Sequence, residues 1–208
     1  MPCAGVRGFL LSRSLYEGGR MRIIVGITGA SGTIYGIRLL EVLRACENIE
    51  THLIISESAK KNIQLETNWK VEKVEALANH VYDNHDLAAP VSSGSFRTQG
   101  MIIAPCSVKT LSGLANSFTT NLLIRAGDVT LKEKRKVIIV FRETPLHLGH
   151  FRLLAQLAEI GAIIMPPVPA FYHHPKTIQD IIDHTIAKIL DQFGLEHHLF
   201  KRWGETKM

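Results

Sequence analysis

Short apolar runs alternate with amphipathic stretches along most of the chain. The apolar runs predict buried strands, one starting at Met21 and the others at 51–55, 100–106, 137–141 and 162–165. Apolar positions three and four residues apart predict helices at 33–44, 58–66, 71–81, 107–115, 121–133, 146–160 and 177–193. Strands that alternate with helices form a mainly parallel sheet covered on both faces. The predicted fold class is therefore α/β, a doubly wound three-layer sandwich.

Length and composition indicate one folded unit. The 208 residues, of which 46% are hydrophobic, suffice for one core, and no shift in composition divides the chain. We predict a single domain of Rossmann or flavodoxin-like type over 21–208. Residues 1–20 are predicted to be a disordered leader, either an upstream start or an expression remnant. Their apolar stretch Phe9-Leu10-Leu11 is too short for a signal peptide.

The charge and the cysteine content limit which partners and which cellular compartment are expected. The net charge of +5 comes partly from arginines in the first 20 residues, and the basic cluster 132–136 is typical of a solvated helix end. No nucleic-acid partner is therefore predicted. No stretch reaches the roughly 18 uninterrupted apolar residues that span a bilayer. The three cysteines form neither a C-x-x-C pair nor an even set, which indicates a reducing compartment, the cytoplasm.

A glycine-rich turn follows the first predicted strand. The segment Gly26-Ile27-Thr28-Gly29-Ala30-Ser31-Gly32 ends the strand and opens a helix. Glycines let the backbone approach an oxyanion, and the first N–H groups of the helix attract it, so a nucleotide or flavin phosphate is predicted here. An NAD site would place an acidic residue after the second strand. That strand ends in Ser56, while Glu57 beside it keeps the NAD alternative open.

Doubly wound sheets bind ligands beyond the carboxyl ends of their strands. In this chain that edge would carry 29–32, Ser56, 107–110, Arg142 with Glu143, and the proline-rich loop 166–175. We expect these segments to share one cleft. Arg142 and Glu143 form either an ion pair at a strand end or a site that recognises phosphate and handles protons. Tyr172 either packs within its loop or contacts a ligand.

The sequence gives no indication of a metal site. It contains no H-E-x-x-H motif and no carboxylate cluster suited to Mg²⁺. The adjacent pairs His173-His174 and His197-His198 would point apart in an extended segment. We therefore predict no metal.

Six motifs occur in order along the chain. They are the glycine-rich turn, Ser92-Ser93-Gly94-Ser95-Phe96, Ala104-Pro105-Cys106-Ser107-Val108-Lys109-Thr110, the segment 125–133, Arg142-Glu143-Thr144-Pro145 and Pro169-Ala170-Phe171-Tyr172-His173. In this order they resemble the signatures of the UbiX-type flavin prenyltransferases, within the superfamily of flavin-dependent cysteine decarboxylase folds. The likeness extends from Met21 to about Trp203.

The resemblance implies an activity. Such an enzyme binds reduced FMN and transfers a dimethylallyl group from dimethylallyl monophosphate to flavin N5 and C6, without a metal. The product, prenylated FMN, would serve a partner UbiD-type decarboxylase of aromatic acids. The resemblance also implies a homo-oligomer, a dodecamer, with flavin at subunit contacts, in which Arg125 and Lys132 reach a site on a neighbour.

The same resemblance implies roles for individual residues. FMN contacts are implied for Gly29, Ala30, Ser31, Ser56, Ser107, Val108, Lys109, Thr110 and Arg142. Contacts to the prenyl phosphate or allyl group are implied for Tyr172, Lys188, Arg125, Lys132 and Trp203, and catalytic roles for Ser31, Glu143, Glu66 and Lys132. Lys188 stands where many relatives carry Arg, which keeps the charge and loses the bidentate fork.

Three other interpretations stay open. An FMN-dependent oxidative decarboxylase of peptidyl or phosphopantothenoyl cysteine would share the fold, but its Pro-x-Met-Asn motif is absent and residues 145–150 read Pro-Leu-His-Leu-Gly-His. A non-catalytic FMN-binding regulatory subunit would not need Glu143, Lys132 or Tyr172. An NAD(P) oxidoreductase would purify without flavin absorbance.

Overall fold

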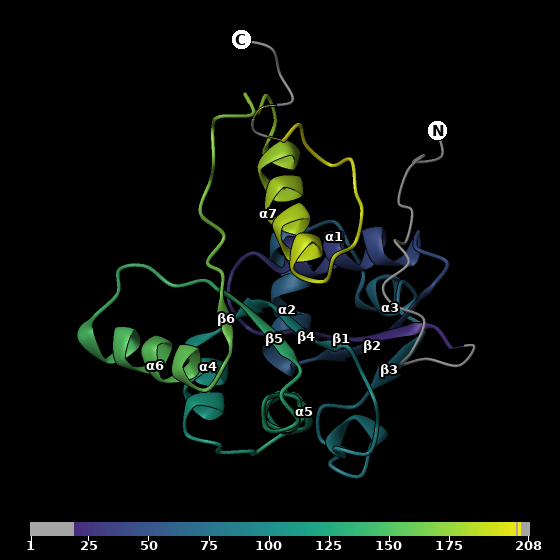
Figure 1. Ribbon diagram of the computed structural model, residues 1–208, viewed down its shortest axis with the longest axis vertical. Helices are drawn as coiled ribbons and strands as arrows, with labels where there is room; N and C mark the ends of the chain where they lie inside the picture. Colours follow the sequence, from purple (N-terminus) through teal and green to yellow (C-terminus); the bar gives the residue numbers. More distant parts are fainter. Residues whose placement is uncertain (1–18, 203, 205–208) are drawn as a thin grey trace.

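The computed structural model describes residues 19–202 and 204, and in them six parallel strands form one sheet (Figure 1). The strands are β1 (Met21–Ile27), β2 (Ile49–Ile55), β3 (His80–Tyr82), β4 (Gly100–Cys106), β5 (Lys136–Phe141) and β6 (Ile163–Ile164). Their order, β3-β2-β1-β4-β5-β6, reverses direction between β1 and β4. This is the Rossmann strand order, and it confirms the doubly wound prediction.

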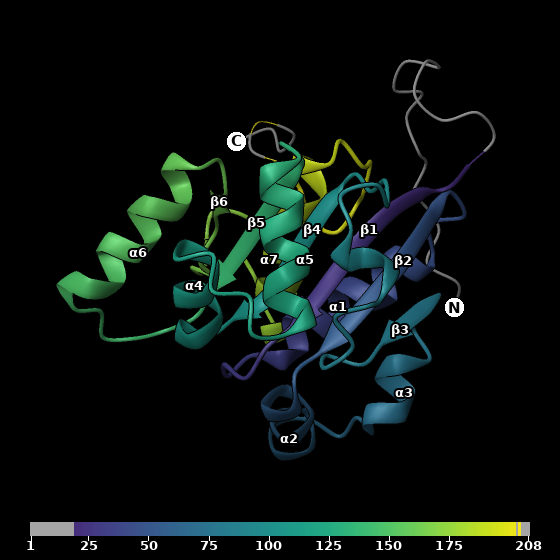
Figure 2. The same ribbon diagram turned by 90° about the horizontal axis from the view of Figure 1, so that it is seen from below.

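Helices cover both faces of the sheet, as Figures 1 and 2 show. The described helices are α1 (Thr33–Arg44), α2 (Glu57–Glu66), α3 (Val71–Glu75), the 3₁₀-helix η1 (Pro90–Ser92), α4 (Val108–Ala115), α5 (Leu122–Lys132), α6 (Leu148–Glu159) and α7 (Ile178–Gln192). Residues of α1, α2, α3 and α7 share one apolar core. Residues of α4, α5 and α6 share the other. The sheet is therefore the middle of three layers.

β1 shows how the sequence fills both cores. Ile23, Val25 and Ile27 pack into the core under α1, whereas Ile24 packs into the core under α5. Successive side chains of a strand point to opposite faces, so an uninterrupted apolar run is buried on both sides. This apolar run is the pattern that predicted a buried strand.

One predicted element is wrong. A helix was expected over 71–81, but α3 ends at Glu75 and the chain then forms the edge strand β3. The side-chain oxygen of Asn79 accepts from the N–H of Thr51 at 2.8 Å, and the N–H of Asn79 donates to the Thr51 hydroxyl at 3.1 Å. These contacts fasten the chain to β2. The other predicted elements begin and end within two residues of the observed ones.

Some sequence predictions lie outside the described residues. They concern Trp203 and residues 1–18 of the predicted leader. In the part that is described, no helix combines the length and the apolar character needed to cross a bilayer. The two cysteines in that part, Cys46 and Cys106, are buried free thiols.

α1 approaches the sheet closely at Gly36. A Cβ atom there would lie 2.3 Å from the carbonyl oxygen of Ala104 and 2.8 Å from the Ile27 side chain. Both neighbours belong to central strands, which cannot yield. We predict that Gly36→Ala lowers the free energy of unfolding by about 1–3 kcal/mol, measured by urea denaturation.

Gly19→Ala is the control for this substitution, because nothing lies within 4 Å of a Cβ at residue 19. Its free energy of unfolding should change by less than about 0.5 kcal/mol. Equal stability of the Gly36→Ala variant and the wild type would contradict the proposed close contact.

Candidate active site

Four predicted site segments follow the carboxyl ends of adjacent strands. Backbone hydrogen bonds of 3.0 to 3.2 Å continue the pairing past the strand ends, from Ser56 to β1 and from Thr28 and Arg142 to β4. The loops after β1, β2, β4 and β5 therefore lie side by side, as the sequence predicted. We call the segments 28–32, Ser56, 107–110 and 142–143 the carboxyl rim.

Thr28 joins the two central loops of the carboxyl rim. Its side chain is fully buried. The hydroxyl donates to the carbonyl oxygen of Pro105 at 2.7 Å and accepts from the N–H of Ser107 at 2.8 Å. This bridge fixes the glycine-rich turn relative to the start of α4. Sequence reasoning missed Thr28, although its place directly after the first strand was an available signal.

Glu66, the last residue of α2, occupies the N-terminus of α1. One carboxylate oxygen accepts from the N–H groups of Gly32 at 2.9 Å and Thr33 at 3.2 Å, and from the Thr33 hydroxyl at 3.2 Å. Burial by itself raises the pKa of Glu66, but these hydrogen bonds and one from Ser31 leave the pKa below its ordinary value. Glu66 is therefore ionised at neutral pH. The amides assigned to a phosphate from the sequence are bound to a carboxylate of the same chain.

The small residues of the turn before α1 differ from one another in conformation and exposure. Gly32 has a φ of 97°, a left-handed conformation that favours glycine. Gly29 lies against Ser58, and a Cβ at Gly29 would be 2.2 Å from the Ser58 hydroxyl oxygen. Ala30 is buried and Ser31 is exposed. Ser31 is thus the side chain of this turn that a ligand can reach.

The N-terminus of α4 is open, unlike that of α1. Ser107 is the N-cap, and its hydroxyl oxygen accepts from the N–H of Thr110 at 3.4 Å. The N–H groups of Val108 and Lys109 have no protein acceptor within residues 19–202 and 204. Unpaired N–H groups at a helix N-terminus attract phosphate. This end of α4 can bind an anion at the carboxyl rim.

Arg142 and Glu143 are exposed at the end of β5. The Glu143 carboxylate accepts from the N–H of Thr144 at 3.0 Å. Among the described residues no ion pair joins Arg142 to Glu143, so the strand-end ion pair considered from the sequence is not formed. Both side chains face solvent and can reach a ligand.

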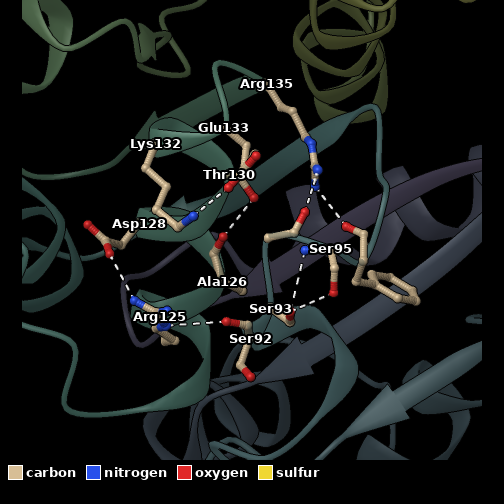
Figure 3. A network of polar contacts seen from close by, with 12 residues as sticks. Ser92, Ser93, Ser95, Arg125, Ala126, Asp128, Thr130, Lys132, Glu133 and Arg135 are labelled. Atoms are coloured by element: carbon tan, nitrogen blue, oxygen red, sulfur yellow. Dashed lines mark hydrogen bonds and ion pairs between the residues drawn. The ribbon is translucent and has the colours of Figure 1, made fainter.

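Arg125 and Lys132 belong to a separate polar network on α5 (Figure 3). The Arg125 guanidinium donates to the carbonyl oxygen of Ser92 at 3.3 Å and to the Asp128 carboxylate at 3.4 Å. Lys132 forms an ion pair with Glu133. The network therefore ties α5 to the serine-rich motif 92–95.

Tyr172 and Lys188 have partners on α7. The Tyr172 hydroxyl is 2.8 Å from Nε2 of His184, and Nζ of Lys188 is 3.6 Å from the Asp191 carboxylate. Burial, reinforced by the charges of His173 and Lys188, lowers the pKa of His184. Sequence reasoning missed His184, whose position one turn before Lys188 was the available signal.

Two of the candidate cations lie toward the other edge of the sheet. α5 ends at Lys132 shortly before β5 begins, which places Lys132 at the amino edge. The carbonyl oxygen of Gln192, at the end of α7, accepts from Lys136 at the first residue of β5. Lys188, about one turn before Gln192, is therefore also near the amino edge. Ser31 follows the carboxyl end of β1, so Lys132 and Lys188 lie toward the opposite edge of the sheet from Ser31 within one chain.

We predict that Thr28→Val destabilises the protein. Valine keeps the shape of threonine but leaves the Ser107 N–H without an acceptor, while the Pro105 carbonyl keeps only the bond from the backbone N–H of residue 28. The free energy of unfolding should fall by about 1–3 kcal/mol in denaturant titrations.

Thr130→Val is the matched control. Thr130 is also buried, at 1% exposure, but its hydroxyl only donates to the helical carbonyl of Ala126 at 2.6 Å. Loss of the Thr130 hydroxyl should lower the free energy of unfolding by less than about 1 kcal/mol. If Thr28→Val lost no more stability than this control, the bridge would not hold the two loops together.

The sequence matches known flavoproteins over most of its length. A family model described as Flavoprotein matches residues 11–190. The chain is 57% identical over 184 residues to the flavin prenyltransferase UbiX of Escherichia coli strain K12, covering 88% of this chain and 97% of the relative. It is 58% identical over 183 residues to flavin prenyltransferase UbiX of Thauera aromatica, covering 88% and 94%.

Solved structures show the same relationship. AnUbiX (PadA1) in complex with FMN and dimethylallyl pyrophosphate is 46% identical with a TM-score of 0.88, covering 90% of this chain and 100% of that chain. A dodecameric FMN-dependent UbiX-like decarboxylase from Escherichia coli O157:H7 is 49% identical with a TM-score of 0.87, covering 88% and 99%. The cypemycin decarboxylase CypD, at 16% identity and a TM-score of 0.59, shares the fold alone. The chain belongs to the flavoprotein family and, within it, to the UbiX-type flavin prenyltransferases.

Proposed function

We propose that this protein transfers the dimethylallyl group of dimethylallyl monophosphate to N5 and C6 of reduced FMN and releases phosphate. The observation that carries the proposal is the carboxyl rim, in a chain 46% identical to a protein solved with FMN and dimethylallyl pyrophosphate. The reaction breaks the carbon–oxygen bond of the allyl phosphate and forms one carbon–nitrogen and one carbon–carbon bond. The product is prenylated FMN.

The donors of the carboxyl rim fit FMN. We assign its phosphate to the N-terminus of α4, where the N–H groups of Val108 and Lys109 lie between the Ser107 and Thr110 hydroxyls. Glu66 already occupies the corresponding amides of α1. The remaining candidates, Gly29, Ala30, Ser31, Ser56 and Arg142, surround the rest of the FMN molecule in this assignment. When bound, reduced FMN supplies the nucleophilic nitrogen and carbon.

Three side chains of the carboxyl rim and its border can move protons. Ser31 directly precedes Gly32, whose N–H binds Glu66, and hydrogen bonds hold the pKa of Glu66 below its ordinary value, so a proton released near Ser31 has an ionised acceptor close by. Glu143 is exposed next to Arg142 and can exchange protons with solvent. We propose that these groups manage protons during ring closure.

The departing phosphate carries negative charge, which cations must stabilise. Arg125, Lys132, Lys188 and the Tyr172 hydroxyl have the required chemistry, and Trp203 would provide an aromatic face for the allyl group. Lys132 and Lys188 lie near the amino edge of their own chain, away from Ser31. We therefore propose that neighbouring copies complete each site, in a homo-oligomer that is a dodecamer, as a similar protein is.

We further propose that the product passes to a UbiD-type aromatic acid decarboxylase in the cytoplasm. The resemblance of the six motifs supports the partner. The buried free thiols Cys46 and Cys106 support a reducing compartment.

The primary test is an anaerobic incubation of the protein with reduced FMN and dimethylallyl monophosphate, read by mass spectrometry. Wild type should yield a flavin heavier by one isoprene unit. Ser31→Ala should retain FMN, because the α4 site is intact, and slow product formation by about 10²–10⁴. Ser112→Ala, within α4 and outside the proposed chemistry, is the control with wild-type rates. Absence of the adduct in wild type refutes the function, and wild-type turnover in Ser31→Ala removes Ser31 from the mechanism.

Mixing of subunits tests the shared site. Ser31→Ala and Lys132→Met are each expected to be inactive, and they are co-assembled by co-expression with different tags. If one site takes Ser31 from one copy and Lys132 from another, random assembly restores roughly one quarter of the sites.

The control pairs Ser31→Ala with Glu66→Gln, whose side chains meet within one chain. That mixture should restore no activity, because every site retains one defect. An inactive mixture of Ser31→Ala with Lys132→Met would show instead that a single chain supplies both groups.

A further inference from the structure

Three side chains of types that can bind a metal meet at the amino edge of the sheet. Glu50 and His52 belong to β2 and His80 belongs to β3, and one ligand atom from each lies within 4.8 Å of the others. Nε2 of His52 is 3.1 Å, and Nε2 of His80 is 3.2 Å, from the same Glu50 oxygen. Within residues 19–202 and 204, no other three histidine, cysteine or acidic side chains converge in this way.

Strand geometry brings the three together. Glu50 and His52 are two residues apart on one strand, so they project from the same face. His80 is the register partner of His52 on β3. The two rings stack with centroids 4.8 Å apart and 12° between their planes. The sequence prediction of no metal considered the H-E-x-x-H motif, carboxylate clusters and adjacent histidines, whereas these ligands meet only once β3 has joined the sheet.

Tyr82 orients the buried histidine. Its hydroxyl is 2.9 Å from Nδ1 of His52, a side chain with 2% exposure. Nε2 of His52 is buried without a hydrogen bond of acceptable geometry, although the Glu50 oxygen is 3.1 Å away. An imidazole nitrogen and a carboxylate oxygen that converge like this are suited to share a cation. A hydrogen bond to the second ring nitrogen is typical of histidines that bind metals.

We propose that Glu50, His52 and His80 bind one divalent transition-metal ion of the zinc class. Metal–ligand distances in tetrahedral zinc sites separate the ligand atoms by about 3.3 Å. The Glu50 oxygen already lies 3.1 and 3.2 Å from the two nitrogens. Two histidines and one glutamate form a known zinc set with a fourth position for water. The His80 side chain is 51% exposed, so its ring can adjust and the fourth position is open to solvent.

Arg22 is the competing partner of Glu50. Its Nε is 3.4 Å from the same carboxylate oxygen, and its guanidinium carbon lies 4.9 Å from the centre of the Phe96 ring. The second oxygen of Glu50 lets the ion pair with Arg22 persist while the first binds the ion. The charge of Arg22 weakens the site but leaves the ligand set complete.

The location indicates a structural role. β3 pairs with β2 through three residues and forms the edge of the sheet. An ion held by Glu50, His52 and His80 would cross-link these two strands. The site lies at the edge opposite the carboxyl rim and does not depend on the proposed function.

Zinc titration of the full chain tests the site. The protein is stripped with EDTA and titrated with zinc chloride in competition with a chromophoric chelator. Wild type should bind one zinc per chain with micromolar or tighter affinity. His80→Gln and Glu50→Gln should each weaken this binding by at least about tenfold, and Tyr82→Phe by about tenfold. His85→Gln, at an exposed histidine of the next loop, is the matched control and should bind as wild type does.

Cobalt(II) provides a second measurement, because a tetrahedral site gives intense visible absorption. Wild type should show it and His80→Gln should not. Stoichiometric zinc binding that survives His80→Gln, an octahedral cobalt spectrum, or no zinc binding by wild type would each overturn the proposal. Circular dichroism verifies that the variants fold, and Glu50→Gln carries the test if His80→Gln does not.

Discussion

The hydroxyl of Thr28 holds together the two loops on which the candidate active site is built. This hydroxyl lies where the strand order reverses, between β1 and β4. It donates to the carbonyl oxygen of Pro105 and accepts from the N–H of Ser107. At such a reversal the crossovers diverge to opposite faces and leave room for a ligand. Because α1 and α4 lie on opposite faces of the sheet, the two loops have no common helix to support them. A buried side chain that pairs two backbone groups supplies that support without filling the ligand space.

Among the helices that begin at the carboxyl rim, α1 and α4 differ in what meets the positive end of the helix. Both have unpaired N–H groups and the positive end of a helix dipole. At α1 this charge is met by Glu66 of the same chain, and at α4 it is open. In the function that we propose, the phosphate therefore binds at α4, while the ionised Glu66 beside Ser31 accepts protons. One internal carboxylate thus separates anion binding from proton transfer.

The two edges of the sheet carry different chemistry. Hydroxyls, amides and Arg142 line the carboxyl rim, whereas Lys132 and the cluster of Glu50, His52 and His80 lie at the amino edge. A single chain cannot bring both edges to one substrate, because the length of the paired strands β1, β2, β4 and β5 separates them. In the oligomer that we propose, one chain's amino edge lies against another chain's rim. The proposed oligomer is therefore part of the active site.

The sequence alone determined the doubly wound sheet, the loops of the carboxyl rim and the family, because apolar periodicity and ordered motifs are local signals. Only the tertiary structure decided that His80–Tyr82 is an edge strand, that Glu66 occupies α1, and that Lys132 stands away from Ser31. Each of these outcomes depends on a contact or a separation between residues far apart in the chain. Periodicity reports which face of an element is buried, but not which distant partner satisfies a given polar group. The fold and the location of the site at the carboxyl rim could therefore be predicted from the sequence. The partners of the charged side chains near the rim could not.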